Sequence, residues 1–118
     1  IGSNSNKDRI LAGLRFVGLD KFFLSNQVYS FDMVQKPKPD PDIYLKVLED
    51  NLLNIEETII IEDSGVGVKA ATSAGVKVLG ITAGKHWHLN RDKHELFDNG
   101  ALNVFSDFES LGKAIEEF

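Results

Sequence analysis

The sequence predicts an α/β fold in which a parallel sheet carries helices on both faces. Segments typical of strands and of helices alternate along the 118 residues. The run TIII at 58–61 is apolar without alternation, as expected of a strand that is covered on both faces, and a helix of small residues follows it. Such alternation implies parallel strands joined by right-handed crossovers. The length suits one domain with one core.

The first half of the chain is expected to hold two helices and one strand. A capping box formed by Ser5 and Asp8, followed by apolar residues at helical spacing, predicts a helix that Gly18 ends. Residues 27–34, QVYSFDMV, are rich in β-branched and aromatic side chains and predict a strand. After a proline-rich loop, Asp40 is expected to cap a second helix that has Pro41 in its first position.

The second half is expected to continue the alternation. After the strand at 58–61, residues 66–74 predict a helix and residues 76–82 the next strand. A long polar connection with room for one short helix leads to a brief strand near 102–105. A capping box formed by Ser106 and Glu109 then predicts a last helix. The expected apolar face of this helix consists of Phe108, Leu111, Ile115 and Phe118.

Composition and charge argue against several classes of protein. The net charge is −5 and the basic residues are scattered, so we expect neither nucleic acid nor a membrane surface as a partner. No apolar run approaches the roughly 18 residues that suggest a membrane span. The chain has no cysteine, which excludes disulfides and thiolate metal sites and favours a reducing compartment. We therefore expect a cytoplasmic location, and a monomer or a weak dimer.

Two adjacent carboxylates, Glu62 and Asp63, follow the apolar strand at 58–61. Ligands of open parallel sheets bind at the carboxyl ends of the strands. Carboxylate oxygens at such a place are the donors that Mg²⁺ prefers while it bridges to a substrate phosphate. A second interpretation stays open, in which Asp63 or Ser64 caps the next helix and Glu62 is solvated.

Three histidines in the polar connection, His86, His88 and His94, do not predict a zinc site. Zinc needs three or four convergent ligands, and this loop offers no thiolate or acidic partner at a recognised spacing. Trp87 lies between two of them and is expected either to contact substrate or to pack.

Three ordered motifs resemble those of the haloacid dehalogenase-like hydrolases, in their phosphatase and β-phosphoglucomutase branch. The stretch IIIEDSGVGVKAATSAGVKVLGIT is similar to the fourth motif of that family, IGSNS to the second, and KPKPDPDIY to the lysine loop. The match spans residue 1 to about residue 82. It implies a three-layer, Rossmann-like core with helices on both faces of a parallel sheet.

The resemblance implies a role for each matching residue. Ser3 stands where the family has its phosphate-binding hydroxyl, and Asn4 would add a backbone or amide donor. Asp63, with Glu62 directly or through water, would hold Mg²⁺. The lysine loop fits in two registers, and Lys38 is favoured over Lys36 because only that register places Tyr44 at the aromatic position. Lys38 would neutralise charge on the transferring phosphoryl group.

The first motif of the family, Asp-x-Asp-x-(Thr/Val), is missing from this sequence. That motif supplies the nucleophilic aspartate, and DPD at 40–42 lies instead within the lysine loop. The central strand that carries the motif and the cap domain that follows it are missing as well. Residues 1–118 therefore resemble the C-terminal part of such a core domain.

The resemblance implies a Mg²⁺-dependent phosphatase that acts on a small phosphorylated metabolite through an aspartyl-phosphate intermediate. The 118 residues alone are expected to be inactive. A sugar phosphomutase is the first alternative, because cap residues decide whether water or a sugar hydroxyl meets the phosphoenzyme. A receiver-like signalling domain is the second, although its acidic pair should precede its lysine. A non-catalytic binding remnant is the third.

Overall fold

The computed structural model describes residues 1–88 and 90–118. Its sheet has three parallel strands in the order β1 (Ile59–Glu62), β2 (Lys77–Ile81) and β3 (Asn103–Phe105). The predicted α/β class and the parallel sheet are confirmed. Within the described part of the chain, no helix has the length and apolar character needed to cross a membrane.

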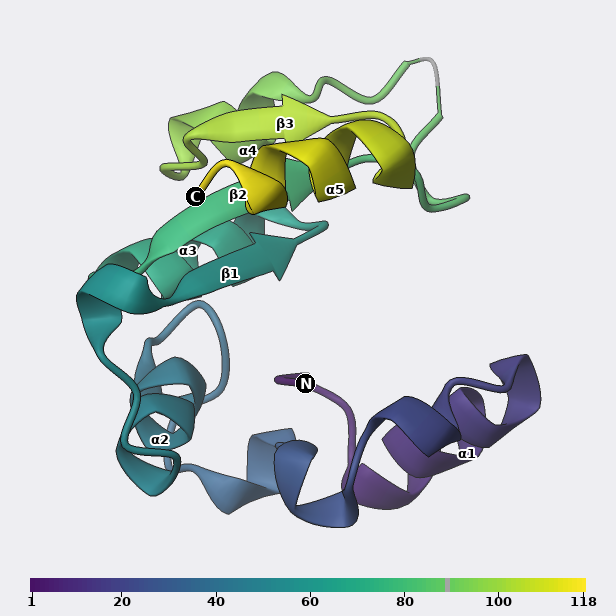
Figure 1. The fold of residues 1–118 in the computed structure, drawn as a ribbon, viewed down its shortest axis with the longest axis vertical. Coiled ribbons are helices and arrows are strands. Elements are labelled where there is room, and N and C mark those ends of the chain that lie inside the picture. Colours follow the sequence, from purple (N-terminus) through teal and green to yellow (C-terminus); the bar gives the residue numbers. More distant parts are fainter. Residues whose placement is uncertain (89) are drawn as a thin grey trace.

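The described residues form five α-helices, of which α3, α4 and α5 pack on the sheet, while α1 lies away from it in the N-terminal part of the chain (Figure 1). Their bounds are α1 (Lys7–Val17), α2 (Asp42–Asp50), α3 (Gly65–Ser73), α4 (His94–Asp98) and α5 (Phe108–Glu116). Short 3₁₀ turns lie at η1 (Asp20–Phe22), η2 (Ser25–Gln27), η3 (Phe31–Met33) and η4 (Ile55–Glu57). Helices α3 and α4 cover one face of the sheet and α5 covers the other, as the sequence predicts.

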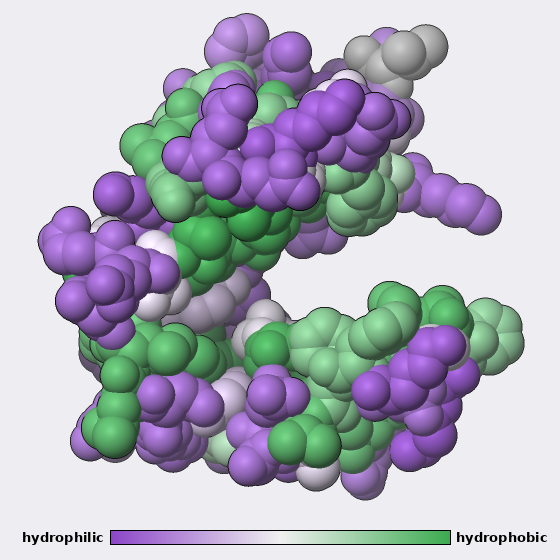
Figure 2. Space-filling view, viewed as in Figure 1, coloured by the Kyte–Doolittle hydropathy of each residue, from purple (hydrophilic) through white to green (hydrophobic). Residues whose placement is uncertain are grey.

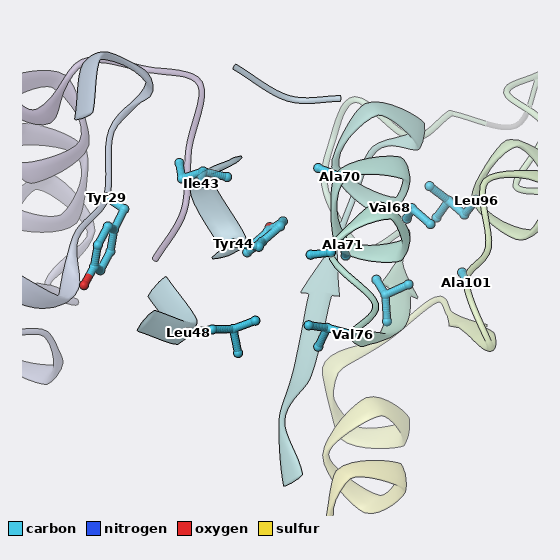
Figure 3. Packing of buried hydrophobic residues seen from close by; sticks show 12 residues of the cluster. Tyr29, Ile43, Tyr44, Leu48, Val68, Ala70, Ala71, Val76, Leu96 and Ala101 are labelled. Atoms are coloured by element: carbon cyan, nitrogen blue, oxygen red, sulfur yellow. The ribbon is translucent and has the colours of Figure 1, made fainter. Parts of the chain in front are cut away.

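The core has a large part on one face of the sheet and a small part on the other. Small side chains of α3, such as Ala70 and Ala71, let this helix lie close to the strands and to Tyr44 of α2 (Figure 3). Across the sheet, Leu111 of α5 packs with Leu79 and with Ile81, which lies at the end of β2. Burial of these apolar groups, at about 25 cal/mol per Å², holds the helices on the sheet.

An open cleft separates the sheet from the N-terminal arm, which comprises residues 1–34 (Figure 2). The first residues run parallel to the segment at Tyr29, with a bridge between Gly2 and Tyr29. The Tyr29 N–H donates to the Ile1 carbonyl at 2.8 Å, and the Ser3 N–H donates to the Tyr29 carbonyl at 3.0 Å. The surfaces that face each other across the opening are largely apolar (Figure 2).

The prediction of a strand at residues 27–34 is wrong. This segment forms the single bridge at Tyr29, and the turns η2 and η3 flank it. Strand propensity reports how well a side chain suits a pleated, half-buried surface, and a ladder also requires a partner over several residues. The first residues of the chain supply that partner at one position only.

The helices are confirmed, but three of their predicted starts are wrong. Asn6, not Ser5, caps α1, and its side chain accepts from the Arg9 N–H at 2.9 Å. Helix α2 begins after Pro41 without a side-chain cap, so Asp40 does not have the predicted role. Asp107, one residue after Ser106, caps α5. The predicted ends after α1 and α3 hold, because Gly18 and Gly75 have φ of 75° and 79°, which favour glycine.

Only two of the four residues expected on the apolar face of α5 pack against the core. Leu111 is buried and Ile115 packs beside it, whereas Phe108 and Phe118 are 70% and 60% exposed. Phe108 is the first residue of α5, and Phe118 lies two residues beyond its end.

Candidate functional site

The predicted site residues line one cleft of about 620 Å³ that runs along β1 to its carboxyl end. Ser3, Asn4 and Lys38 reach it from the N-terminal arm and the lysine loop. Glu62 and Asp63 reach it from β1 and the turn that follows. Residues that lie up to 60 positions apart in the sequence thus meet at the edge of the sheet where ligands of parallel sheets bind.

The strand geometry sends the two adjacent carboxylates in different directions. Strand β1 ends at Glu62, one residue later than predicted. Successive side chains of a strand point to opposite faces, and Glu62 lies on the face of Ile60, under α3. Its side chain is 6% exposed, whereas that of Asp63 is 55% exposed. The pair therefore offers one buried and one open carboxylate.

Lys38 is held inside the cleft by three contacts. Its Nζ forms an ion pair with Glu62 Oε1 and donates to the Gly2 carbonyl at 2.9 Å. The same Nζ lies 5.0 Å from the centre of the Tyr44 ring. Only 9% of the Lys38 side chain is exposed. These contacts restrict the Lys38 side chain to one conformation, so its charge lies at one point of the cleft.

The side chains of Asn4 and Ser3 make different kinds of hydrogen bonds. The Asn4 side chain accepts from the Lys38 N–H at 3.1 Å and donates to the Lys38 carbonyl at 3.2 Å. These two bonds join the N-terminal arm to the lysine loop. Ser3 Oγ accepts from the Ser5 N–H at 3.1 Å, which leaves its own hydroxyl hydrogen for another acceptor.

The loop after β2 contacts Asp63 from the other side. The Trp87 indole N–H donates to the Asp63 carbonyl at 2.8 Å, and His86 Nε2 lies 3.5 Å from Asp63 Oδ2. Arg91 stacks over Trp87 with 4.2 Å to the ring centre, and it pairs with Glu95 at 2.7 Å. The hydrogen bond from Arg91 is the main cause that lowers the pKa of Glu95. Trp87 packs against the core, as one of its two interpretations expects, and the other, a contact with substrate, stays a prediction.

The cap interpretation also proves correct in part. Ser64 caps α3, and its hydroxyl oxygen accepts from the Gly67 N–H at 3.1 Å. Glu62 is not solvated, as that interpretation would have it. Capping by Ser64 leaves the Asp63 carboxylate available for a ligand.

The donors around Asp63 fit Mg²⁺ only in part. Mg²⁺ takes six oxygens and keeps several waters beside one or two carboxylates and substrate phosphates. Asp63 provides one exposed carboxylate, while Glu62 Oε1 already accepts hydrogen bonds from the Lys38 ammonium and the Tyr44 hydroxyl. Among residues 1–88 and 90–118, no group of three histidine, cysteine or acidic side chains could hold a metal ion. The predicted metal role of Glu62 stays a prediction.

The sequence-based prediction did not anticipate the role of the Tyr44 hydroxyl. Tyr44 was expected only as the aromatic residue of the lysine loop, yet its O–H donates to Glu62 Oε1. Burial and the Glu62 charge raise the pKa of Tyr44 well above its usual value, so the phenol stays a neutral donor. Its aromatic position in KPKPDPDIY was the available signal, but a motif does not state where a hydroxyl points.

The chain is similar in sequence and in fold to several known proteins. A family model described as haloacid dehalogenase-like hydrolase matches residues 1–81. A phosphorylated carbohydrates phosphatase from Thermotoga maritima is 34% identical over 113 residues, which cover 94% of this chain and 49% of that protein. A hydrolase of the family from Deinococcus radiodurans, solved with bound phosphate and sodium, superposes with a TM-score of 0.88 at 30% identity. It is covered to 51%, and this chain to 99%.

A further structure from Thermotoga maritima, provisionally named a β-phosphoglucomutase, gives a TM-score of 0.83 at 32% identity, with 99% of this chain and 51% of that chain covered. The chain thus spans about half the length of the relatives it matches. The family model covers the cleft residues on both sides, from Ser3 to Asp63. The chain belongs to the haloacid dehalogenase-like hydrolases.

Proposed function

We propose that this chain forms the phosphate-holding half of a Mg²⁺-dependent phosphomonoester hydrolase that acts on a small phosphorylated metabolite. The observation that carries the proposal is the convergence of Ser3, Lys38 and Asp63 on one cleft. A hydroxyl donor, a fixed cation and an open carboxylate form a set that suits a phosphate oxygen and a metal ion. The relative named for phosphorylated carbohydrates points to a sugar phosphate as the substrate class.

Each residue has a role in this proposal. The Ser3 hydroxyl and the Lys38 ammonium hold phosphoryl oxygens, and Asn4 contributes its backbone N–H because its side chain is engaged with Lys38. Asp63 would hold Mg²⁺, with Glu62 next to it, and the ion would offset the phosphoryl charge. Positioned charges of this kind favour phosphoryl transfer because they need no reorganisation when charge develops.

The nucleophile comes, in this proposal, from a further strand that fills the cleft. Strand β1 is paired on one side only, by β2, within the described residues. Residues 1–3 pair with another backbone segment on one side only, at Tyr29, and on the other side the Gly2 carbonyl accepts from Lys38 Nζ. Unpaired edges of this kind accept a strand readily, and apolar side chains from both edges line the space between them. We place there an aspartate whose carboxylate attacks phosphorus, expels the alcohol and is later freed by water.

A phosphomutase remains the second candidate, supported by the relative that is provisionally named a β-phosphoglucomutase. The two activities differ in whether water or a sugar hydroxyl receives the phosphoryl group. The family match leaves the receiver-like alternative without support. The lack of cysteine and the net charge of −5 favour a cytoplasmic enzyme, monomeric or weakly dimeric, that binds no nucleic acid.

The test compares two proteins. The longer protein that carries this sequence is expected to release phosphate from a panel of sugar phosphates when Mg²⁺ is present. The 118-residue chain is expected to release none above background and to aggregate, since its cleft exposes apolar surface. A monodisperse chain that hydrolyses p-nitrophenyl phosphate by itself would contradict the proposal. The nucleophile would then be sought among Asp20, Asp32, Asp40 and Asp42.

A further inference from the structure

Tyr44 and Lys38 share one oxygen of Glu62. The Tyr44 O–H and the Lys38 ammonium both donate to Glu62 Oε1, although the two donors come from α2 and from the loop before it. Tyr44 is 8% exposed and its ring packs against the small-residue face of α3 (Figure 3). The ring also lies under the Lys38 ammonium. The Tyr44 hydroxyl therefore orients the Glu62 carboxylate, and the face of the Tyr44 ring contacts the Lys38 ammonium.

Gly67 completes the space around Glu62. A Cβ built at position 67 would overlap Glu62 Oε2, so the carboxylate lies directly against the backbone of α3. Gly67 is buried, and the three atoms nearest to such a Cβ all belong to the Glu62 side chain. The Glu62 carboxylate is thus confined on one side by the Tyr44 hydroxyl and on the other by the backbone of α3 at Gly67.

We propose that Tyr44 and Gly67 are positioning residues that fix Glu62 and, through it, the ammonium of Lys38 at the cleft. The inference rests on the proposed function for its consequence, because Lys38 holds phosphate only in that function. A lysine has four rotatable side-chain bonds and is a flexible point charge. A held charge stabilises a developing phosphoryl charge without the reorganisation that a free one requires.

Each position has a matched control elsewhere in the chain. Tyr29 is a second buried tyrosine, 4% exposed, whose hydroxyl lies 3.3 Å from an oxygen of Asp50. Tyr29→Phe therefore removes the same hydroxyl from the same core without touching Glu62. Gly13 lies within α1, and a Cβ there meets nothing within 4 Å. Gly13→Ala and Gly67→Ala bring the same gain in helix propensity, so only the second should disturb the site.

The first experiment measures Lys38 directly and needs no catalysis. An amine-reactive reagent is applied to the longer protein, and tandem mass spectrometry compares labelling of Lys38 with that of Lys46, whose side chain is 35% exposed. Lys38 should label slowly in the parent and several-fold faster in Tyr44→Phe and in Gly67→Ala. Equal Lys38 labelling in Tyr44→Phe and the Tyr29→Phe control would overturn the inference, whether or not the protein is a phosphatase.

The second experiment separates positioning from loss of folded protein. In Tyr44→Phe, the KM for the phosphomonoester and the inhibition constant of inorganic phosphate should rise between about twofold and tenfold, the range that one hydrogen bond supports. Partial unfolding lowers kcat and leaves both constants unchanged, so that result would overturn the inference while the proposed function stands. If the parent shows no phosphatase activity, the proposed function fails and the labelling result alone decides.

Discussion

Replacing Lys38 by methionine should destabilise the protein more than any exposed lysine substitution, because it leaves the buried Glu62 charge without its cation. The two side chains are 9% and 6% exposed, so water cannot take over the role of the ammonium. Removing one partner of a buried ion pair typically costs about 3–5 kcal/mol. With a urea m-value of about 2 kcal/mol per M, the midpoint of unfolding should fall by about 1.5–2.5 M.

Two further variants give this prediction its controls. Lys46 forms an exposed pair with Asp50 at 3.2 Å, and Lys46→Met should cost less than about 0.5 kcal/mol. In the double variant Lys38→Met with Glu62→Gln, most of the loss should return, because no buried charge remains unpaired and Tyr44 can still donate to the amide oxygen. All variants are measured by urea unfolding of the longer protein that the proposed function assumes. Equal costs for Lys38→Met and Lys46→Met would refute the reasoning.

Three other outcomes are expected. Asp63→Asn should abolish Mg²⁺-dependent turnover with little change in the unfolding midpoint, because the side chain is half exposed; Mg²⁺ binding as tight as in the parent by isothermal titration calorimetry would refute the metal role. Lys36→Ala should leave kcat nearly unchanged while Lys38→Ala lowers it by orders of magnitude, and the reverse ranking would assign the role to Lys36. The Ser110 backbone N–H donates to Asp107 and holds the pKa of that carboxyl below its usual value, so the wild type should lose stability as the pH falls through that pKa. Asn at position 107 still caps α5 but does not titrate, so the melting temperature of Asp107→Asn should fall less over the same pH range.

The sequence by itself determined the α/β class, the α-helices and the three strands of the sheet. These features depend on local signals that tertiary contacts did not override. An apolar run predicts a buried strand. A glycine with positive φ ends a helix after Val17, as predicted at Gly18. Three ordered motifs and their resemblance to a known family identified Ser3, Lys38 and Asp63, because serines before helices and surface lysines are too common for local signals to single them out.

Tertiary structure alone decided how those residues are used. The strand expected at 27–34 reduced to one bridge at Tyr29, since a ladder needs a neighbouring chain that the local sequence does not contain. A shift of one residue at the end of β1 put Glu62 inside the strand, and a period of two then buried it while Asp63 stayed open. The hydroxyl of Tyr44 found Glu62 only because α2 packs on α3, which is a property of the assembled core.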